Sequence, residues 1–393
     1  MMMLVKDYAE QIRGVSYKPE DVCEELNDES ITLLRANNIT DSGLCFDDLV
    51  YVRRNKVKDV QKLQKGDILI CTSSGSKALV GKAAYVTKDM DMTFGAFCKV
   101  IRPHGVNTDY FQYFFQSPAY RKKISELAAG ANINNIRNEH IDGLAFYLPD
   151  LPTQQRIADT LDKVSEGIEV CRRMLDELEL MVKAKFGEMF GDMLLNSKHW
   201  SECTLESLAD IVSGITKGRK TKDENLIEVP YMAVSNVKDG HIDWRTVKTI
   251  MATTQEINQY RLQSDDVLMT EGGDPDKVGR GAIIKNPPEN CIHQNHIFRV
   301  RLNEKVILPT FFAEYLQHQK AKRYFLGCAK QTTGIASINM RQLKAMPVLL
   351  PPIELQEQFA TFVSKTDKSR LTIQQVLSKM EMVKLALMHE YFG

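Results

Sequence analysis

The sequence predicts an α+β protein with two similar mixed α/β domains, each followed by one long helix, and the two helices packed antiparallel as a coiled coil. Three observations predict it: a seven-residue apolar repeat after residue 149, a second copy 202 residues later (351 minus 149), and the same order of elements before each copy, as in a pseudo-twofold internal repeat. The predicted segments are 1–150 (domain 1), 151–198 (helix 1), 199–350 (domain 2) and 351–393 (helix 2).

The two long helices are predicted from the spacing of their apolar residues, which recur in alternating steps of four and three, as in a coiled-coil seam. Helix 1 carries Ile157, Leu161, Val164, Ile168, Cys171, Leu175, Leu178 and Val182. Helix 2 carries Phe359, Val363, Ile373, Leu377, Met380, Leu387 and Tyr391, with Thr366, Arg370 and Lys384 as polar interruptions. The helices should run antiparallel, because the chain leaves domain 1 along helix 1 and returns from domain 2 along helix 2.

Each domain shows the same order of predicted elements. In domain 1 we expect strands over 30–39, 66–73 and 94–103, a helical region over 108–130 and an asparagine-rich loop over 130–141. Their counterparts in domain 2 lie at offsets between 198 (230 minus 32) and 202 (333 minus 131). The drift in offset indicates that the two domains share an architecture but differ in loop length.

Composition excludes several classes of protein. The 393 residues allow two or three domains, and 51 basic residues balance 51 acidic ones, so the net charge does not by itself point to a polyanionic partner and charge has to be read locally. The eight cysteines form no C-x-x-C pair, which disfavours a zinc site and a disulfide scaffold and fits reduced thiols. Without an apolar run of about 18 residues or a signal-like start, a cytoplasmic protein is expected.

Four stretches resemble one family over the whole chain, the specificity subunits of type I restriction–modification systems. They are LPDLPTQQRIADTL (148–161), LPPIELQEQFATFV (350–363), EGGDPDKVGRG (271–281) and HQNHIFRVR (293–301). The first departs from the family pattern, with Asp150 inside the proline pair and Thr153-Gln154-Gln155 for the usual Leu-x-Glu-Gln. That difference concerns the details of partner contact.

The resemblance implies a non-catalytic subunit without a cofactor or metal of its own, in which two target-recognition domains read a bipartite, asymmetric site on double-stranded DNA. The long helices would be spacers that set the gap between the half-sites. It also implies two methyltransferase subunits, which methylate adenine with S-adenosylmethionine, and through them restriction subunits that hydrolyse ATP.

Candidate DNA-binding residues lie mostly in loops that match between the domains. A basic loop should bind phosphate, since lysine and arginine displace condensed counterions, although a solvated surface loop is the plainer alternative. It contains Lys217, Arg219, Lys220 and Lys222. Base reading needs paired donors and acceptors. Candidates in domain 1 are Asn37, Ser74, Lys77, Asn132, Asn134, Asn135 and Arg137, and in domain 2 Ser235, Asn236, Lys277, Arg280, Gln331, Thr332, Thr333, Ser337, Asn339 and Arg341.

Two rival functions remain open: a self-contained restriction–methylation enzyme and a duplicated coiled-coil scaffold that binds only protein. Against the enzyme, Asn286-Pro287-Pro288 is followed by Glu289 where an adenine methyltransferase needs an aromatic ring, and no glycine loop for S-adenosylmethionine follows a strand. Pro275-Asp276 lacks the Glu-x-Lys of a nuclease. His293 and His296 are more typical of ordinary strand residues than of a metal pair.

Overall fold

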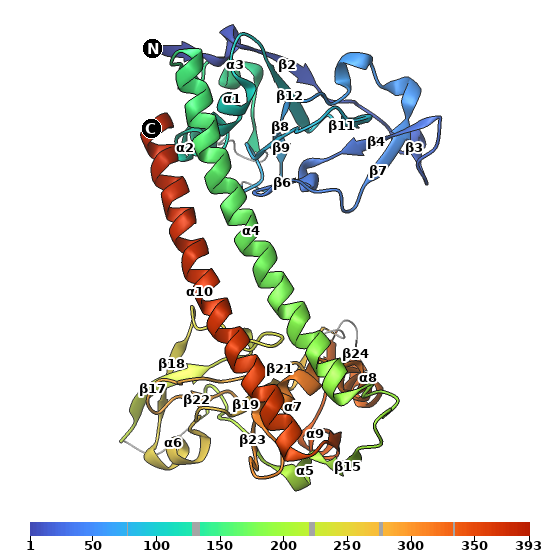
Figure 1. The fold of residues 1–393 in the computed structure, drawn as a ribbon, viewed down its shortest axis with the longest axis vertical. Coiled ribbons are helices and arrows are strands. Elements are labelled where there is room, and N and C mark those ends of the chain that lie inside the picture. The colour runs from blue at the N-terminus through green and yellow to red at the C-terminus, as the bar shows by residue number, and fades with distance from the viewer. Residues whose placement is uncertain (77, 128–133, 220–224, 275–277, 333–334) are drawn as a thin grey trace. The chain divides into compact units, whose positions relative to one another are not determined.

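The structure, a computed structural model, describes all residues except 77, 128–133, 220–224, 275–277 and 333–334. The chain forms two compact units, one of Met1–Arg172 with Gln375–Gly393 and one of Arg173–Gln374. Each unit contains one domain and parts of both long helices, α4 (Leu151–Phe190) and α10 (Ile353–Phe392), which have 40 residues each (Figure 1). No helix among the described residues is long and apolar enough to cross a membrane.

Domain 1 contains two four-stranded sheets. The first has the order β10-β8-β12-β2 and is antiparallel throughout, and the second has the order β11-β4-β7-β3 with one parallel pair, β11 with β4. Two-stranded sheets join β1 to β14, β9 to β13 and β5 to β6. The strands are β1 (Met2–Leu4), β2 (Ala9–Arg13), β3 (Val22–Cys23), β4 (Ser30–Leu34), β5 (Ile39–Thr40), β6 (Gly43–Leu44), β7 (Val50–Arg53), β8 (Ile68–Cys71), β9 (Ser73–Ser74), β10 (Ala83–Tyr85), β11 (Met92–Phe94), β12 (Cys98–Pro103), β13 (Asn134–Asn135) and β14 (Ala145–Tyr147).

The helices of domain 1 follow its first sheet. They are α1 (Thr108–Phe114), α2 (Pro118–Leu127) and α3 (Asn138–Asp142). Short 3-10 turns lie earlier in the chain, between the strands: η1 (Val5–Asp7), η2 (Pro19–Asp21), η3 (Ala36–Asn38), η4 (Arg54–Lys56) and η5 (Asp59–Gln61). The strand expected over 30–39 ends at Leu34, because the Asn38 amide holds the turn η3: its oxygen accepts the N–H of Arg35 at 2.8 Å and its nitrogen donates to the carbonyl of Cys45 at 3.0 Å.

Domain 2 repeats the first sheet of domain 1 with the order β16-β23-β19-β21, again antiparallel. A three-stranded sheet β18-β17-β22 replaces the second one, β20-β25-β24 form another, and β15 pairs with β26. The strands are β15 (Ser201–Thr204), β16 (Ala209–Ser213), β17 (Ile227–Met232), β18 (Lys248–Ala252), β19 (Val267–Thr270), β20 (Gly272–Gly273), β21 (Gly281–Ile283), β22 (Ile292–His293), β23 (Ile297–Leu302), β24 (Lys330–Thr332), β25 (Ile335–Ser337) and β26 (Pro347–Leu350). The helices are α5 (Leu205–Leu208), η6 (Val234–Asn236), α6 (Thr254–Tyr260), α7 (Pro309–Gln317), α8 (Gln319–Cys328) and α9 (Met340–Lys344).

The predicted seam residues of the long helices are turned away from solvent. On α4, Ile157, Leu161, Ile168, Cys171 and Val182 are buried and the other three are half-buried. On α10 no seam position is exposed, and this includes the polar interruptions Thr366, Arg370 and Lys384. Long polar side chains can bury their aliphatic stems in this way.

The helices run antiparallel within each unit. In the first unit the Arg172 guanidinium bonds Glu381 at 3.0 Å, and the Met388 side chain near the end of α10 joins the core that contains Leu161 near the start of α4. In the second unit Phe186 packs against Phe359 with ring centroids 5.4 Å apart. The end of one helix therefore packs beside the start of the other.

Equivalent ends of the two helices complete the domain cores. Phe190, the last residue of α4, packs on Phe311 of α7 with centroids 4.9 Å apart, and Phe392, the last residue of α10, packs on Tyr110 of α1 at 5.2 Å. Helix α4 ends at Phe190, before the predicted end at residue 198, because Gly191 adopts φ +77° and donates its N–H to the carbonyl of Gly187, a glycine termination.

Candidate nucleic-acid interface

Backbone hydrogen bonds join the two loops of domain 1 that are expected to read bases, the loop after β8 and the asparagine-rich loop. Strand β9 pairs with β13, which places Ser74 opposite Asn134. Thr72, just before β9, donates its N–H to the carbonyl of Phe97 at 2.8 Å, and the Thr72 carbonyl accepts the N–H of Ile136 at 2.8 Å. Three segments distant in sequence thus meet: the loop after β8, the turn before β12 and the asparagine-rich loop. We call this meeting point the loop junction.

Domain 2 has a loop junction built from the same bonds. Glu271 donates its N–H to the carbonyl of His296 at 3.0 Å, and its own carbonyl accepts the N–H of Ile338 at 2.8 Å. Strand β20 pairs with β25, with Gly272 opposite Ser337. Two domains with different side chains therefore hold three equivalent segments together through equivalent backbone contacts.

A close backbone approach fixes the turn of each junction. A Cβ on Gly14 would clash with the carbonyl of Gly95, and one on Gly214 with the carbonyl of His293. Only glycine permits this approach. The following residue bonds across the gap in both domains, Val15 at 2.7 Å to Phe94 and Ile215 at 2.9 Å to His293.

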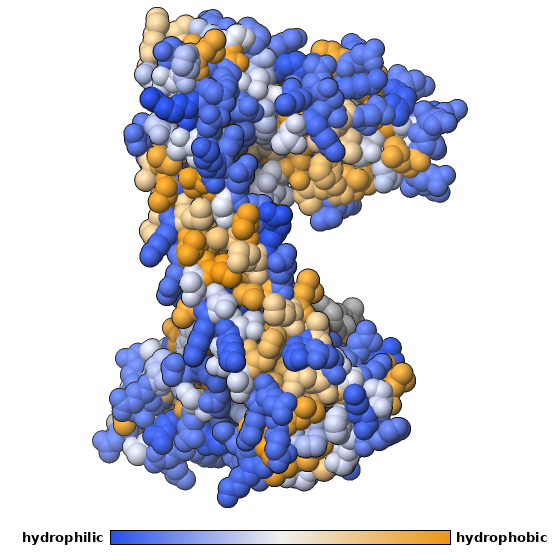
Figure 2. All heavy atoms as spheres, in the orientation of Figure 1, coloured by the Kyte–Doolittle hydropathy of each residue, from blue (hydrophilic) through white to orange (hydrophobic). Residues whose placement is uncertain are grey.

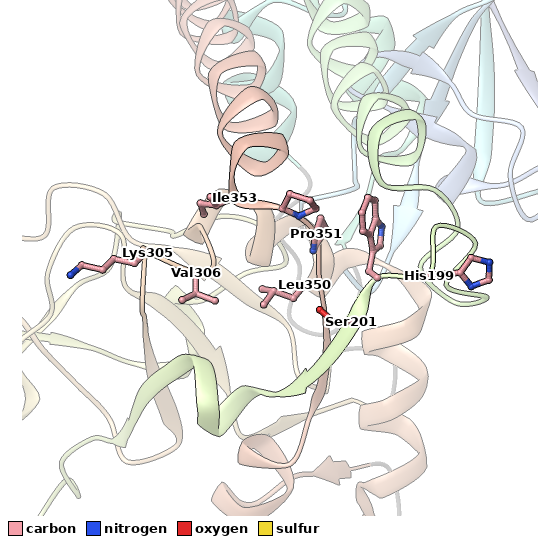
Figure 3. Close-up of a pocket in the computed structure, with 9 residues that line it drawn as sticks. His199, Ser201, Lys305, Val306, Leu350, Pro351 and Ile353 are labelled. Carbon is pink, nitrogen blue, oxygen red and sulfur yellow. The ribbon is translucent and has the colours of Figure 1, made fainter.

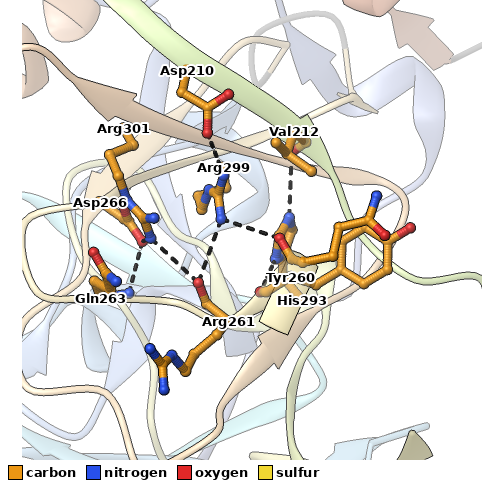
Figure 4. A network of polar contacts seen from close by, with 10 residues as sticks. Asp210, Val212, Tyr260, Arg261, Gln263, Asp266, His293, Arg299 and Arg301 are labelled. Carbon is orange, nitrogen blue, oxygen red and sulfur yellow. Dashed lines mark hydrogen bonds and ion pairs between the residues drawn. The ribbon is translucent and has the colours of Figure 1, made fainter. Parts of the chain in front are cut away.

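An ion-pair network anchors the strands behind the domain 2 junction (Figure 4). Arg301 of β23 holds Asp266 through two bonds of 2.7 and 2.8 Å, and Arg299 bonds Asp210 of β16 at 2.5 Å. The Asp266 side chain also accepts the N–H of Gln263 at 2.7 Å. Burial lowers the pKa of the Arg299 guanidinium.

Domain 1 contains the same arginine–aspartate clamp. Arg102 holds Asp67 through two bonds of 2.7 Å, and Asp67 accepts the N–H of Gln64 at 2.8 Å. Both aspartates are 1% exposed. A buried carboxylate paired this way fixes its strands, because removing one partner would leave an uncompensated charge. The clamp is a structural element, separate from the loops that face solvent.

His293 belongs to the same interior and not to a metal pair with His296. Its side chain is fully buried, with Nδ1 3.1 Å from the Tyr260 carbonyl and Nε2 3.3 Å from the Val212 carbonyl (Figure 4). Burial lowers the pKa of His293 to about 4. His296 lies on the exposed turn instead, with Nδ1 2.5 Å from a Glu271 carboxylate oxygen. Nowhere in the described part of the chain do three or more His, Cys, Asp or Glu residues form a group that could hold a metal ion.

Several predicted base-reading residues surround the loop junctions. In domain 1, Asn135 and Arg137 are exposed and Ser74 is half-buried. Arg137 keeps 71% of its side chain exposed beside Glu139, 3.7 Å away. Its donors therefore remain accessible to a ligand.

The domain 2 junction displays a different set. Arg341 is exposed on α9, and Ser337 is half-buried in β25. Asn339 is also exposed, but its side-chain oxygen accepts the N–H of Gln342 at 3.0 Å and caps α9. Arg280, half-buried after Gly279, has a buried Nε without a hydrogen-bond partner among the described residues.

Comparison with known proteins agrees with this duplicated architecture. The family described as type I restriction modification DNA specificity domain matches residues 13–180 and again residues 197–381. The chain belongs to this family. It is a specificity subunit of a type I restriction–modification system, with two copies of the specificity domain.

Similar proteins include specificity subunits from two enterobacteria. The chain is 31% identical to the type I restriction enzyme EcoKI specificity subunit of Escherichia coli over 90% of this chain and 79% of that one. It is 32% identical to the StySPI specificity subunit of Salmonella potsdam, with the same coverage. The crystal structure of a type I S subunit from M. genitalium has a similar fold, with a TM-score of 0.58 at 16% identity over 100% of this chain and 96% of that one.

The predicted phosphate-binding loop of the specificity subunit is less uniform than its sequence suggests. Lys217 is exposed. Arg219 instead grips the Glu256 carboxylate with two nitrogens and donates to the carbonyl of Met251 at 3.1 Å. The pKa of Glu256 is lowered, first by this pairing with Arg219. Arg219 therefore positions the loop, and of the two described cations Lys217 is the one that projects into solvent.

Asn236 requires a correction, because the structure gives it a role inside the protein rather than on a base. It is fully buried, its oxygen accepts the N–H of Ala233 at 2.9 Å and its nitrogen donates to the carbonyl of Asp243 at 2.9 Å. Asn38 does the same in domain 1. The neighbouring positions Asn37 and Ser235 are exposed, and Asn37 donates to Asp48 at 2.9 Å.

Some predicted residues lie outside the described residues. These are Lys77, Asn132, Lys220, Lys222, Lys277 and Thr333. For Asn134, Gln331 and Thr332 the structure describes the backbone in β13 and β24.

Sequence reasoning missed a glutamine that ties each long helix to its domain. Gln154 accepts the N–H of Asn107 at 2.9 Å and donates to the carbonyl of Pro149 at 2.7 Å. Gln356 accepts the N–H of Leu308 at 2.9 Å and donates to the carbonyl of Pro351 at 2.9 Å. Both glutamines are at most 2% exposed. The signal was available, because both family motifs carry a glutamine five residues after their first proline.

Two hollows lie away from the junctions. One, of about 440 Å³, is bounded by residues 199–201, 305–306 and 350–353 at the start of α10. The Lys305 and His199 side chains point outward at its opposite margins, so its centre is formed by Leu350, Pro351 and their neighbours (Figure 3). It offers packing surface rather than catalytic groups.

The second hollow is an open cleft of about 1630 Å³ within the first unit, where domain 1 faces α4 and α10. Two pairs of its polar groups bond each other: the Tyr113 hydroxyl donates to Asp162 at 2.5 Å and the Tyr85 hydroxyl to Asp109 at 2.6 Å. Burial raises the pKa of Asp162 and is the largest cause that raises the pKa of Tyr85 to about 12.

Proposed function

We propose that this specificity subunit recognises a bipartite, asymmetric site on double-stranded DNA, with each domain reading one half through its loop junction. The equivalent backbone bonds of the two junctions, at Thr72 and Glu271, carry this proposal. Two domains with the same scaffold but different exposed side chains can bind DNA in the same way and recognise two different sequences. Asn, Arg, Ser and Gln groups supply the donors and acceptors that base edges require.

Exchange of one loop tests the assignment of half-sites. Residues 130–141 would be replaced by the corresponding loop of another specificity subunit, in cells that hold the methyltransferase subunits, and the methylated motif would be mapped across the genome. We expect a new sequence in one half-site and no change in the other. Exchange of 331–341 should change only the other half. An unaltered motif in both experiments would refute base reading by these loops.

We further propose that α4 and α10 set the gap between the half-sites. A 40-residue helix is about 60 Å long, and the seams keep the two helices in register within each unit. Four residues inserted into each helix, near 165–169 in α4 and at the facing position of α10, add about 6 Å. The gap should then grow by one to two base pairs, because DNA rises about 3.4 Å per base pair. Both half-sites should stay the same, and an unchanged gap would contradict the spacer role.

The outer faces of the helices are proposed as the docking surface for two methyltransferase subunits and, through them, restriction subunits. Apolar side chains are exposed along both helices (Figure 2). On α4, Val170, Met174 and Met181 are 42%, 43% and 48% exposed, and on α10 Met382 and Val383 are 60% and 49% exposed. Exposed apolar residues near one another mark interaction surfaces.

Charge substitutions test this docking surface. Met181→Glu and Val383→Glu should weaken copurification with the methyltransferase subunit by at least about tenfold, because a carboxylate cannot be buried unpaired without cost. Lys368→Glu, an exposed position elsewhere on α10, is the matched control. Equal copurification of all three variants would exclude this face.

We also propose that catalysis is a property of the complex and not of this subunit alone. We place that complex in the cytoplasm, where the eight free cysteines stay reduced.

A further inference from the structure

The exposed tip of the turn in each loop junction carries a side chain that the proposed function does not use. Phe97 is 69% exposed, although a phenylalanine normally packs in the interior. Its counterpart, 199 residues later (296 minus 97), is His296, whose side chain is 55% exposed. Both residues hold the same position, because the next residue donates back across the turn, Cys98 to Gly95 at 2.8 Å and Ile297 to Gln294 at 2.9 Å.

The backbone beneath these side chains is fixed by the loops that are proposed to read bases. The Phe97 carbonyl accepts hydrogen bonds from the N–H of Thr72 at 2.8 Å, the N–H of Ser73 at 3.1 Å and the Thr72 hydroxyl at 3.1 Å. The His296 carbonyl accepts the N–H of Glu271. A base contacted by the neighbouring loops would therefore lie within reach of the turn.

The two tips differ in chemistry. Phe97 presents an apolar ring, and Lys99 in the following strand β12 bonds Gln11 at 3.3 Å and Asn138, the first residue of α3. At the other tip Glu271 orients the His296 ring through Nδ1, whereas Nε2 lies 3.4 Å from the Asn295 side-chain nitrogen, which is longer than an ordinary hydrogen bond and leaves Nε2 open to a base edge. The first tip suits an apolar group, and the second suits a hydrogen-bonding base edge.

We propose that the turns 95–98 and 294–297 form a third reading element in each recognition surface, beside the two loops. Phe97 contacts the C5-methyl group of a thymine in the half-site of domain 1, and His296, held by Glu271, makes a hydrogen bond with a base edge in the half-site of domain 2. Apolar contact with the thymine methyl and polar contact with base edges are the two modes of direct readout in the major groove. This inference rests on the proposed reading of one half-site by each domain.

The test uses the full chain with its methyltransferase subunits and maps the methylated motif for two variants. Phe97→Ala should reduce discrimination at one base pair of the domain 1 half-site by about tenfold, the scale of one mismatched position. His296→Ala should do the same in the domain 2 half-site. In each case the other half-site should be unchanged, which makes it an internal control for folding. Phe97→Leu should keep most of the discrimination, because it keeps an apolar surface.

Matched controls are Phe46→Ala in domain 1 and His241→Ala in domain 2, which alter exposed residues of the same types on other loops. The inference is overturned if the turn variants and these controls give the same motif while loop exchange rewrites a half-site, and in that case the proposed function still holds. Equal weakening of both half-sites by Phe97→Ala also overturns it, since that result indicates a general defect. If neither the turns nor the loops affect the motif, the proposed function fails as well.

Discussion

The buried imidazole of His293 should make the stability of domain 2 depend on pH in a way that domain 1 does not share, because Phe94 holds the equivalent, fully buried position there. Burial lowers the pKa of His293 from 6.5 to about 4, with a smaller contribution in the same direction from Arg299, while the Val212 and Tyr260 carbonyls act against it. Between these values the unfolded chain binds a proton that the folded domain does not. Stability is therefore complete above pH 6.5 and falls as the pH drops toward 4.

The magnitude follows from the two pKa values. The whole difference corresponds to about 3 kcal/mol, of which about 2 kcal/mol is lost between pH 7.5 and pH 5. The variant His293→Phe copies the residue of domain 1 and should lose this dependence. At pH 7.5 it should be less stable than the wild type by about 1 kcal/mol, because the one N–H of the neutral imidazole no longer donates to a buried carbonyl. At pH 5 it should be more stable by about 1 kcal/mol.

Urea unfolding of the full chain at the two pH values, followed by tryptophan fluorescence, measures this effect. Both tryptophans, Trp200 and Trp244, belong to the unit that contains domain 2, so the signal reports that unit. Carboxylates that titrate near pH 5 affect wild type and variant alike, and the difference between the two proteins isolates the imidazole. If both proteins lose the same stability between pH 7.5 and pH 5, the two carbonyls hold the ring proton in the folded state and the lowered pKa is wrong.

Three further predictions concern substitutions whose outcomes follow from the contacts of the replaced side chains. Gln356→Leu should lower the free energy of unfolding by about 2 kcal/mol, because buried backbone groups lose their partners. Exposed Gln358→Leu should change it by less than about 0.5 kcal/mol, and similar losses for the two variants in urea unfolding would contradict the role of Gln356 in tying α10 to its domain. Asp266→Asn should lower the free energy of unfolding by about 3 kcal/mol in the same assay, since its arginine partner keeps an uncompensated charge. An unchanged free energy of unfolding would show that the pair is dispensable. Lys217→Ala should reduce the slope of log K against log salt for DNA binding by about 0.9. Arg219→Ala should leave that slope unchanged, because the Arg219 charge is already paired with the Glu256 carboxylate. Equal effects of the two variants on the slope would mean that Arg219 leaves Glu256 when DNA binds.

Periodic features of the fold could be predicted from the sequence because they are local. The seam of α10 was predicted position by position, and Arg370 and Lys384 occupy it as half-buried residues even though their charges interrupt the apolar pattern. The strands near 66–73 and 94–103 appeared as β8 and β12. Repetition strengthened each prediction, because an element that recurs at the same offset is unlikely to arise from chance apolar spacing.

The site was harder to predict because its residues are selected by contacts that are distant in sequence. Asn236 is of a residue type that reads bases and lies in a loop, and only its burial shows that its side chain stabilises its own turn instead. Arg219 lies in a basic cluster, yet its partner Glu256 is 37 residues away (256 minus 219). Phe97 resembled an ordinary strand residue, and its exposure follows from the tight turn that ends just before β12.

The central claim is that each domain reads its own half of one DNA site, and a chimera tests it most directly. Residues 1–150 would be replaced by a second copy of 199–350, and the methylated motif would be determined in cells that supply the methyltransferase subunits. The equivalent clamps, glutamines and junctions of the two domains predict that the chimera folds and that its motif contains the half-site of domain 2 twice. A motif that still contains the original half-site of domain 1 would contradict the account.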